Sequence, residues 1–497
     1  MLDKQKYSEI IFKLLEINPH FKRIIDSKNL KYYYEPACNW KPDSKNFPYK
    51  ENLKSRIIDN IKKVYDIETA YLVKKYFDSN FCAETGSHIS IPRSQDKVGK
   101  NISVNRNINT LIFQGTILSA AKNINNENKI HFSMGTSRVY LNNANSAAYI
   151  QFDKDDGCVR LVSNRWKDTP QIYIPSFELS GILNLKMQAT NFIRKKYANK
   201  VDELQNGIKN IEKIFAFFEE VSTKENAENK NNLTFSEQIS KVNSFLFNEI
   251  LSQTGLKHVS IDYEKISWDF LIELLEDKKS ITYKIFSDKK LRDKFLNIFS
   301  EIQTGWQSGQ LPFDEVIEKN GIKKLFPLIA SEIENSESDL FIEKILENLR
   351  ENRIIPKGVL QFFLFMIEGG LLPLGGMNQS IYCTKIRDLS IHFLQNDLGE
   401  HERAAALKKL PSEIMNISLS WGIMKGTNDL LCYSDFLEKE IKLNKSHMHS
   451  ILNIPGEDAL NLSIPSLCEF LLQENFDPLF ENQFIQQIKE KGNILQL

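Results

Sequence analysis

The sequence has no closely spaced pair of cysteines. Its cysteines lie far apart, at Cys38, Cys82, Cys158, Cys383, Cys432 and Cys468. Zinc ribbons and thioredoxin-like redox centres need two cysteines a few residues apart, so both kinds of site are excluded. Scattered single thiols are typical of proteins in a reducing compartment, and we therefore expect a cytoplasmic protein with free cysteines.

Long apolar runs and an excess of one charge are also missing. No stretch reaches the roughly 18 apolar residues of a membrane-spanning helix. Residues 1–17 form an amphipathic pattern that contains lysines, and they lack the apolar core and cleavage site of a signal peptide. Lys+Arg and Asp+Glu are equal, at 64 each, so no overall field favours nucleic acid or an anionic membrane. We expect a soluble protein without a membrane or a nucleic acid as partner.

The pattern of apolar residues divides the chain into regions. Residues 1–80 are predicted to be an N-terminal helical region, with helices at 3–25 and 50–78. Residues 237–497 are predicted to be mainly helical, with one strand at 258–261. Residues 81–177 are predicted to be a strand-rich α/β core segment, which the C-terminal region completes. Its expected strands are at 88–91, 110–113, 129–133, 138–141, 147–152, 158–162 and 171–174. Together these regions predict a mixed α/β fold.

Residues 178–222 are predicted to form a long helix with a coiled-coil seam. Apolar residues recur there at alternating spacings of about four and three, as in heptads. They are Tyr197, Val201, Leu204, Ile208, Ile211, Phe215 and Phe218. Such a seam needs a partner, either in this chain or in a second copy, so a homodimer through residues 197–218 is a prediction. The polar residues 223–236 are the expected linker.

The segment Glu84-Thr85-Gly86-Ser87-His88 is the strongest candidate for chemistry. It joins a predicted helix to a predicted strand and carries an acid, two hydroxyls, a glycine and a histidine. His88 is a candidate general base, and Arg93 a candidate for holding a carboxylate or phosphate. Thr85, Gly86 and Ser87 are the expected substrate contacts. The alternative is a helix end closed by Gly86, with His88 in a structural hydrogen bond.

A second candidate is the glycine-rich stretch that runs from 369 to 376. Gly375 and Gly376 precede a predicted helix, whose free N–H groups suit an anion, and Asn378 and Gln379 add polar contacts. The alternative is a structural turn between buried helices. Two other segments suggest metal binding, His447-Met448-His449 and the acidic run 153–156. Because neither offers a complete set of ligands, polar turns are favoured for both and no metal is predicted.

The order of these segments resembles the family of cysteine-adding enzymes (cysteine ligases) of bacillithiol biosynthesis. Thr85-Gly86-Ser87-His88 is similar to that family's Thr-Gly-Gln-Gln stretch, and Val259-Ser260-Ile261-Asp262 to a strand that ends in Asp. Gly375, Gly376, Ile381 and Tyr382 are similar to its Gly-Gly-Pro-Gly-Glu-Ile-Ala-Tyr motif, with Gln379 in the place of the glutamate. The resemblance implies a Rossmann-like core with helical connecting domains, a coiled coil, and Tyr382 as a further substrate contact.

The resemblance also implies a function. The family's Glu-Asp-His-Asp cluster is replaced here by His131-Phe132-Ser133-Met134-Gly135. We therefore expect a biosynthetic ligase that joins a different amino acid or amine to a small polar substrate. Its cofactor is left open, with a nucleotide as the candidate.

Two alternatives belong to other classes. Leu111-Ile112-Phe113-Gln114-Gly115-Thr116 and Gly135-Thr136-Ser137-Arg138-Val139-Tyr140 resemble the two NAD-binding strands of ADP-ribosyltransferases. That resemblance implies NAD, a protein target, Gln114 in place of a histidine and Glu178 as the nearest candidate acid. The second alternative is a non-enzymatic helical scaffold that dimerises through residues 197–218.

Overall fold

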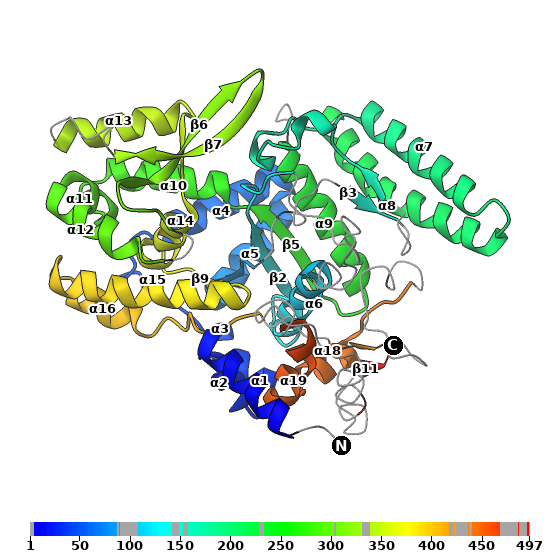
Figure 1. Cartoon of the computed structure of the whole chain (residues 1–497), viewed down its shortest axis with the longest axis horizontal. Coiled ribbons are helices and arrows are strands. Elements are labelled where there is room, and N and C mark those ends of the chain that lie inside the picture. The colour runs from blue at the N-terminus through cyan, green and yellow to red at the C-terminus, as the bar shows by residue number, and fades with distance from the viewer. Residues whose placement is uncertain are drawn as a thin grey trace.

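A computed structural model describes most of the chain. It covers residues 4–86, 89, 108–141, 149–152, 158–227, 233–302, 305–330, 338–416, 422–423, 436, 440–467, 486 and 495–496. The fold is mixed α/β, as predicted: helices surround a four-stranded parallel sheet (Figure 1). No helix in this part of the chain combines the length and hydropathy that a membrane span requires.

The parallel sheet is assembled from short strands that are distant in sequence. Its strands are β1 (Cys82–Glu84), β2 (Ile130–Gly135), β5 (Lys257–Asp262) and β9 (Leu372–Leu374). Their order is β5-β2-β1-β9, and neighbouring strands are parallel. In register, His131 lies opposite His258, and Glu84 opposite Leu374. Strands buried on both faces have no alternating pattern, which makes β1 and β9 difficult to recognise.

Helices cover both faces of the sheet. They are α4 (Lys50–Val64), α5 (Ile67–Ser79), α6 (Ile108–Ala121) and α9 (Phe235–Leu251). On the α5 face, the rings of Phe77 and Phe132 lie 5.1 Å apart. On the opposite face, the ring of Phe247 from α9 lies 4.8 Å from that of His258. Because residues 131 and 132 point to opposite faces of β2, the core has three layers.

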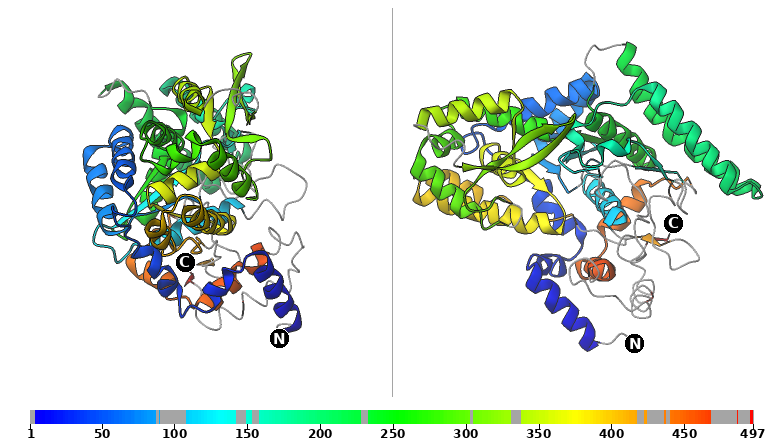
Figure 2. Two further views of the ribbon diagram at one scale, coloured as in Figure 1. Left: turned by 90° about the vertical axis from the view of Figure 1, so that its left-hand side faces the viewer. Right: turned by 45° about the horizontal axis from the view of Figure 1, so that its top comes forward.

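The remaining elements extend this core. They are α1 (Lys4–Ile17), α2 (Phe21–Ile25), α3 (Leu30–Cys38), β3 (Tyr149–Gln151), β4 (Cys158–Arg160), α7 (Leu179–Lys196), α8 (Val201–Ala227), α10 (Glu264–Glu276), α11 (Ile281–Ser287), α12 (Lys289–Phe299), β6 (Gln310–Lys319), β7 (Ile322–Ile329), α13 (Ser338–Arg350), β8 (Ile354–Pro356), α14 (Gly358–Phe363), the π-helix η4 (Leu364–Glu368), α15 (Met377–Asn396), α16 (His401–Leu407), β10 (Gly422–Ile423), α18 (Lys445–Leu452), α19 (Gly456–Leu467) and β11 (Leu495–Gln496). Figures 1 and 2 show the N-terminal helices α1 and α2 beside α19, from the other end of the sequence. The hydroxyl of Tyr7 donates to Asn461 at 2.8 Å across this contact.

The predicted strand at 110–113 is wrong, because these residues belong to α6. The helix lies against β2, with its second half buried on all sides, so its apolar residues show no helical period. The ADP-ribosyltransferase resemblance requires a strand at Leu111–Thr116, where the structure has this helix instead. The predicted strand at 171–174 is also wrong, because residues 171–173 form a 3-10 turn.

The long helix at 178–222 is interrupted. It consists of α7 and α8, which pack against each other after a turn at 197–200. The second half of the predicted seam, Ile211, Phe215 and Phe218, is buried within the chain, whereas Val201 is 67% exposed. Helix α8 extends to Ala227 and α9 begins at Phe235, so the predicted linker is helical at both of its ends.

The C-terminal region contains a second sheet that the helical prediction missed. Strands β6, β7 and β8 form an antiparallel sheet in the order β7-β6-β8. Asn320 and Gly321, with φ of 56° and 71°, make the turn of the β6–β7 hairpin. An Asn-Gly pair between two strands is a strong hairpin signal, so this sheet was predictable from the sequence.

Candidate functional site

The carboxyl ends of β1, β2, β5 and β9 lie at one edge of the sheet, because the strands are parallel. From β1 the chain moves outwards to β2 and β5, and it then returns to place β9 on the other side of β1. After β9 it continues into α15, away from α6 (Figure 1). In open α/β sheets, ligands bind at the carboxyl edge where the strand order reverses in this way. Thr85 follows β1 at this point, and Gly375 follows β9.

The two predicted site segments lie against each other at this edge. The backbone N–H of Thr85 donates to Leu374 O at 2.9 Å, which continues the pairing of β1 with β9. The side-chain amide of Gln379 donates to the hydroxyl of Thr85. Gly86 packs so closely on the glycine loop that a Cβ there would lie 2.9 Å from Gly376 N. Thus Thr85, Gly86, Gly375, Gly376 and Gln379 form one group, although their segments are about 290 residues apart.

The glycine loop opens α15, as predicted, and it follows a buried strand. The backbone N–H of Asn416 donates to Gly375 O at 2.7 Å, and the amide of Asn18 donates to Met377 O at 3.2 Å. These contacts fix the start of α15. A side chain at position 375 would overlap that of Gln379, so glycine at 375 leaves room for Gln379 to reach Thr85.

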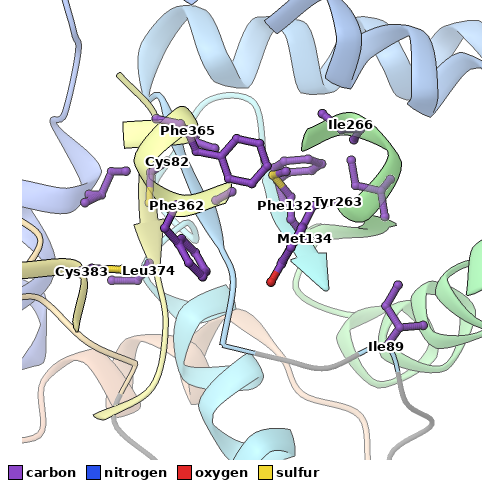
Figure 3. Packing of buried hydrophobic residues seen from close by; sticks show 14 of the residues in the cluster. Cys82, Ile89, Phe132, Met134, Tyr263, Ile266, Phe362, Phe365, Leu374 and Cys383 are labelled. Carbon is purple, nitrogen blue, oxygen red and sulfur yellow. The ribbon is translucent and has the colours of Figure 1, made fainter. Parts of the chain in front are cut away.

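The remaining predicted residues are in different positions. Asn378 is exposed on the first turn of α15. Tyr382 is half-buried, with its ring 5.5 Å from that of Phe362, so it contributes to packing beneath the loop. In Figure 3, Phe362 lies between Leu374 on one side and Tyr263 on the other. Ser87, His88 and Arg93 lie outside the described residues.

A second polar group at the same edge was missed by the sequence analysis. Ser137 follows β2, and its hydroxyl donates to Asp262, the last residue of β5, at 2.5 Å. Asp262 also accepts the backbone N–H of Glu264 at 3.0 Å. Burial, aided by the charge of Glu264, raises the pKa of Asp262 to about 7. Near neutral pH this carboxyl therefore exchanges a proton readily, as a general base must. The signal in the sequence was an aspartate at the end of a predicted strand.

Glu264 connects this group to the second sheet. It accepts hydrogen bonds from Thr136 at 2.5 Å and from Gln361 at 2.6 Å, and Arg138 lies 3.6 Å away. Arg138 also pairs with Asp314 of β6 at 2.7 Å. Three hydrogen-bonding or charged partners thus hold the Glu264 carboxylate in one position at the edge of the sheet.

A third polar cluster lies inside the sheet, on the α6 and α9 face. Nδ1 of His131 lies 2.8 Å from Nδ1 of His258, and its Nε2 lies 3.2 Å from Glu84. Thr116 of α6 donates to Glu84 at 3.1 Å. Burial lowers the pKa of both histidines and raises that of Glu84. These side chains are almost fully buried, so the cluster connects three strands in the core.

Within the described residues, no group of three or more histidine, cysteine or acidic side chains is arranged to hold a metal ion. His447 and His449 lie on α18, where His447 forms a capping box with Asn444. The acidic run at 153–156 lies outside the described residues. Comparison of the sequence with models of known protein families and with curated proteins gives no match.

Proposed function

We propose that this chain is a cytoplasmic biosynthetic enzyme of the ligase class, with a Rossmann-like core. It binds a small polar substrate at the carboxyl edge of the sheet and joins an amino acid or amine to it. The observation that carries the proposal is the contact of Gln379 with Thr85. It brings two segments that were selected independently for their chemistry to the point where ligands bind in open α/β sheets.

The roles of the residues follow from their positions. Thr85 and Gly86, together with Ser87 next in the sequence, contact the substrate from the segment after β1. Gly375, Gly376, Asn378 and Gln379 contact it from the loop and α15, with Tyr382 packed beneath them. The first N–H groups of α15 suit a negatively charged group of the substrate. His88 and Arg93 orient or activate the substrate. Their positions in the sequence, shortly after Gly86, support this assignment.

Asp262 is the proposed proton acceptor. An amine attacks a carbon only when it is unprotonated, and a carboxylate with a pKa of about 7 can take that proton. In joining an amine to a carboxylate, a C–N bond forms and one carboxylate oxygen leaves. That oxygen first takes the terminal phosphate of a nucleoside triphosphate, the co-substrate, which releases the nucleoside diphosphate. The oxygen then leaves the carbon as part of inorganic phosphate when the amine attacks. Asp262 ends β5, and the Thr85–Gln379 contact lies after β1. Two strand spacings separate them, roughly 10 Å at about 4.8 Å per strand, which leaves room for two parts of a joined product.

The helical arm of α7 and α8 supports a homodimer (Figure 2). Val201, Met187 and Leu183 are 67, 58 and 47% exposed on it. Apolar side chains gathered on one arm favour contact with a second copy. Light scattering tests the dimer: a strict monomer at high protein concentration, or an unchanged mass after Met187→Lys in a dimeric protein, contradicts it.

Ligand binding and product formation test the enzyme itself. We expect one or more amino acids or amines to raise the melting temperature of the full chain, and mass spectrometry to detect a joined product in the presence of a nucleoside triphosphate. Gln379→Ala and His88→Ala should each weaken binding or turnover about tenfold or more. Ile317→Gln, at an exposed position of β6, is the matched control. If both site variants stay folded and bind as the wild type does, the proposal is wrong.

A further inference from the structure

A cavity of about 540 Å³ lies at the opposite, amino edge of the sheet. It is lined by residues that come just before the strands: Ser79 precedes β1, and Lys122, Asn123, Asn125 and Asn126 lie between α6 and β2. Helix α3 forms another wall, and α18 contributes Leu452. Small-molecule sites enclose about 300–1,000 Å³, so this cavity has the size of a ligand site.

Lys122 places a positive charge in the wall of this cavity. The residue is only 8% exposed, and its Nζ lies 3.6 Å from Cys82 Sγ. Burial raises the pKa of Cys82, so this thiol stays neutral and does not balance the charge. Among the residues that the structure describes, no carboxylate lies within ion-pair distance of Lys122. The charge of Lys122 also acts on Glu84, but burial raises the pKa of this carboxyl. An anion in the cavity supplies a closer counter-ion for the nearly buried ammonium.

Asn123, the next residue, provides a second and independent observation. Its side chain is 1% exposed, and neither its Nδ2 nor its Oδ1 has a hydrogen-bond partner. The amide lies near the Tyr76 hydroxyl, without the geometry of a hydrogen bond. Leaving both groups of a buried amide unpaired is unfavourable, because each group has lost its hydrogen bonds to water. Asn123 lies in the wall of the cavity, so a ligand with hydroxyl groups placed against this wall offers the amide a donor and an acceptor.

The rim of the cavity is also rich in positive charge and in amide groups. Lys31 and Lys41 add positive charge, against the single carboxylate of Glu35. Asn39, Asn125 and Asn126 add further amides, and Tyr32 contributes a half-exposed ring. Amides bind hydroxyl groups in both directions, and lysines bind phosphate or carboxylate groups.

We infer that this cavity is a binding site for a small polyhydroxylated anion of the size of a sugar phosphate or sugar acid. Lys122 binds the anionic group and Asn123 a hydroxyl group. The site is separate from the carboxyl edge, because the strands of the sheet lie between Lys122 and Thr85. The inference goes beyond the proposed ligase function and does not depend on it.

Calorimetry and thermal unfolding of the full chain test the inference. The probes are glucose 6-phosphate, glucuronate, inorganic phosphate and uncharged glucose. We expect glucose 6-phosphate or glucuronate to bind and to raise the melting temperature, more strongly than inorganic phosphate does, and we expect glucose not to bind. Lys122→Met should weaken this binding about tenfold or more, whereas Lys122→Arg should retain most of it.

Control variants separate this site from its surroundings. Asn123→Leu keeps the ammonium of Lys122. It should weaken the binding of glucose 6-phosphate and glucuronate while leaving the binding of inorganic phosphate unchanged. Ile317→Gln, at an exposed position of β6, should leave all these affinities unchanged. The inference is overturned if no anion binds at about 10 mM, if glucose binds as well as its phosphate, or if a folded Lys122→Met variant binds as the wild type does.

Discussion

Gln379 on α15 donates its side-chain amide to the hydroxyl of Thr85, which follows β1. Both side chains are buried, at the point where β1 and β9 end side by side. This contact connects the two segments of the proposed site, so it can be tested directly.

Gln379→Leu removes the donor while keeping similar volume, and Thr85→Val removes the acceptor. Each should destabilise the fold by about 1–2 kcal/mol, because a buried polar group loses its partner. In the double variant the losses should not add: a coupling of about 1 kcal/mol is expected from urea unfolding of the four proteins. Strictly additive losses would show that the contact contributes nothing to stability.

The glycines of the site differ in the space around them. A Cβ at position 86 would meet Gly376 N at 2.9 Å and Gly375 Cα at 3.2 Å, whereas a Cβ at position 376 meets nothing within 4 Å. Gly86→Ala should therefore cost roughly 1–3 kcal/mol, because backbone atoms must move apart. Gly376→Ala, at a similarly half-buried position, is the control and should change the free energy of unfolding by less than about 0.5 kcal/mol. Equal effects of the two changes would contradict this packing.

The raised pKa of Asp262 predicts that the protein becomes less stable as pH rises. Its pKa is about 7 in the fold, above its ordinary value of 3.8. The protonated form is therefore favoured in the folded state, and its contribution to stability is complete below about pH 4 and lost as pH rises through about 7. Between pH 5 and pH 8, the free energy of unfolding of Asp262→Asn, measured with urea, should rise by roughly 2–3 kcal/mol relative to that of the wild type. A difference that stays constant with pH would disprove the raised pKa.

The lowered pKa values of His131 and His258 predict the opposite: through this pair, the protein becomes less stable as pH falls. Burial lowers both pKa values below 6.5. Their stabilising contribution is therefore present above pH 6.5 and lost as pH falls towards the folded values. The double variant His131→Leu/His258→Leu should lose less stability than the wild type between pH 6.5 and pH 4.5, by about 1 kcal/mol or more.

His392 provides the control for this pair. It is exposed on α15, so His392→Gln should retain the pH dependence of the wild type. If the double leucine variant and the wild type lose stability in parallel, the buried histidines do not titrate as expected.

The sequence predicted an element correctly where the local pattern of apolar, polar and glycine residues belongs to that element alone. The apolar run at 258–261 lies within β5, and the run at 129–133 largely within β2. Gly375 and Gly376 indicated the start of α15 because glycines before a polar first turn are a local signal. Elements without periodicity were missed or mistaken: the apolar second half of α6 is buried on all sides, and β9 is only three residues long.

The candidate site was predicted in part for the same reason. Thr85, Gly86 and the glycine loop stand out as polar or glycine-rich segments within apolar surroundings. Ser137 has no such context, and its contact with Asp262 depends on the pairing of β2 with β5. Likewise, His131 and His258 become partners only because they are opposite each other in register.

By itself, the sequence determined the mixed α/β class and the two segments most suited to binding. Both depend on local patterns of apolar, polar and glycine residues. Only the tertiary structure decided that Gln379 meets Thr85, that Asp262 is buried beside Glu264, and that Lys122 faces a cavity. The reason is physical: strand order brings together residues that are far apart in the chain, and burial then sets their charge and pKa. Neither the pairing partner nor the depth of burial is encoded in a short stretch of sequence.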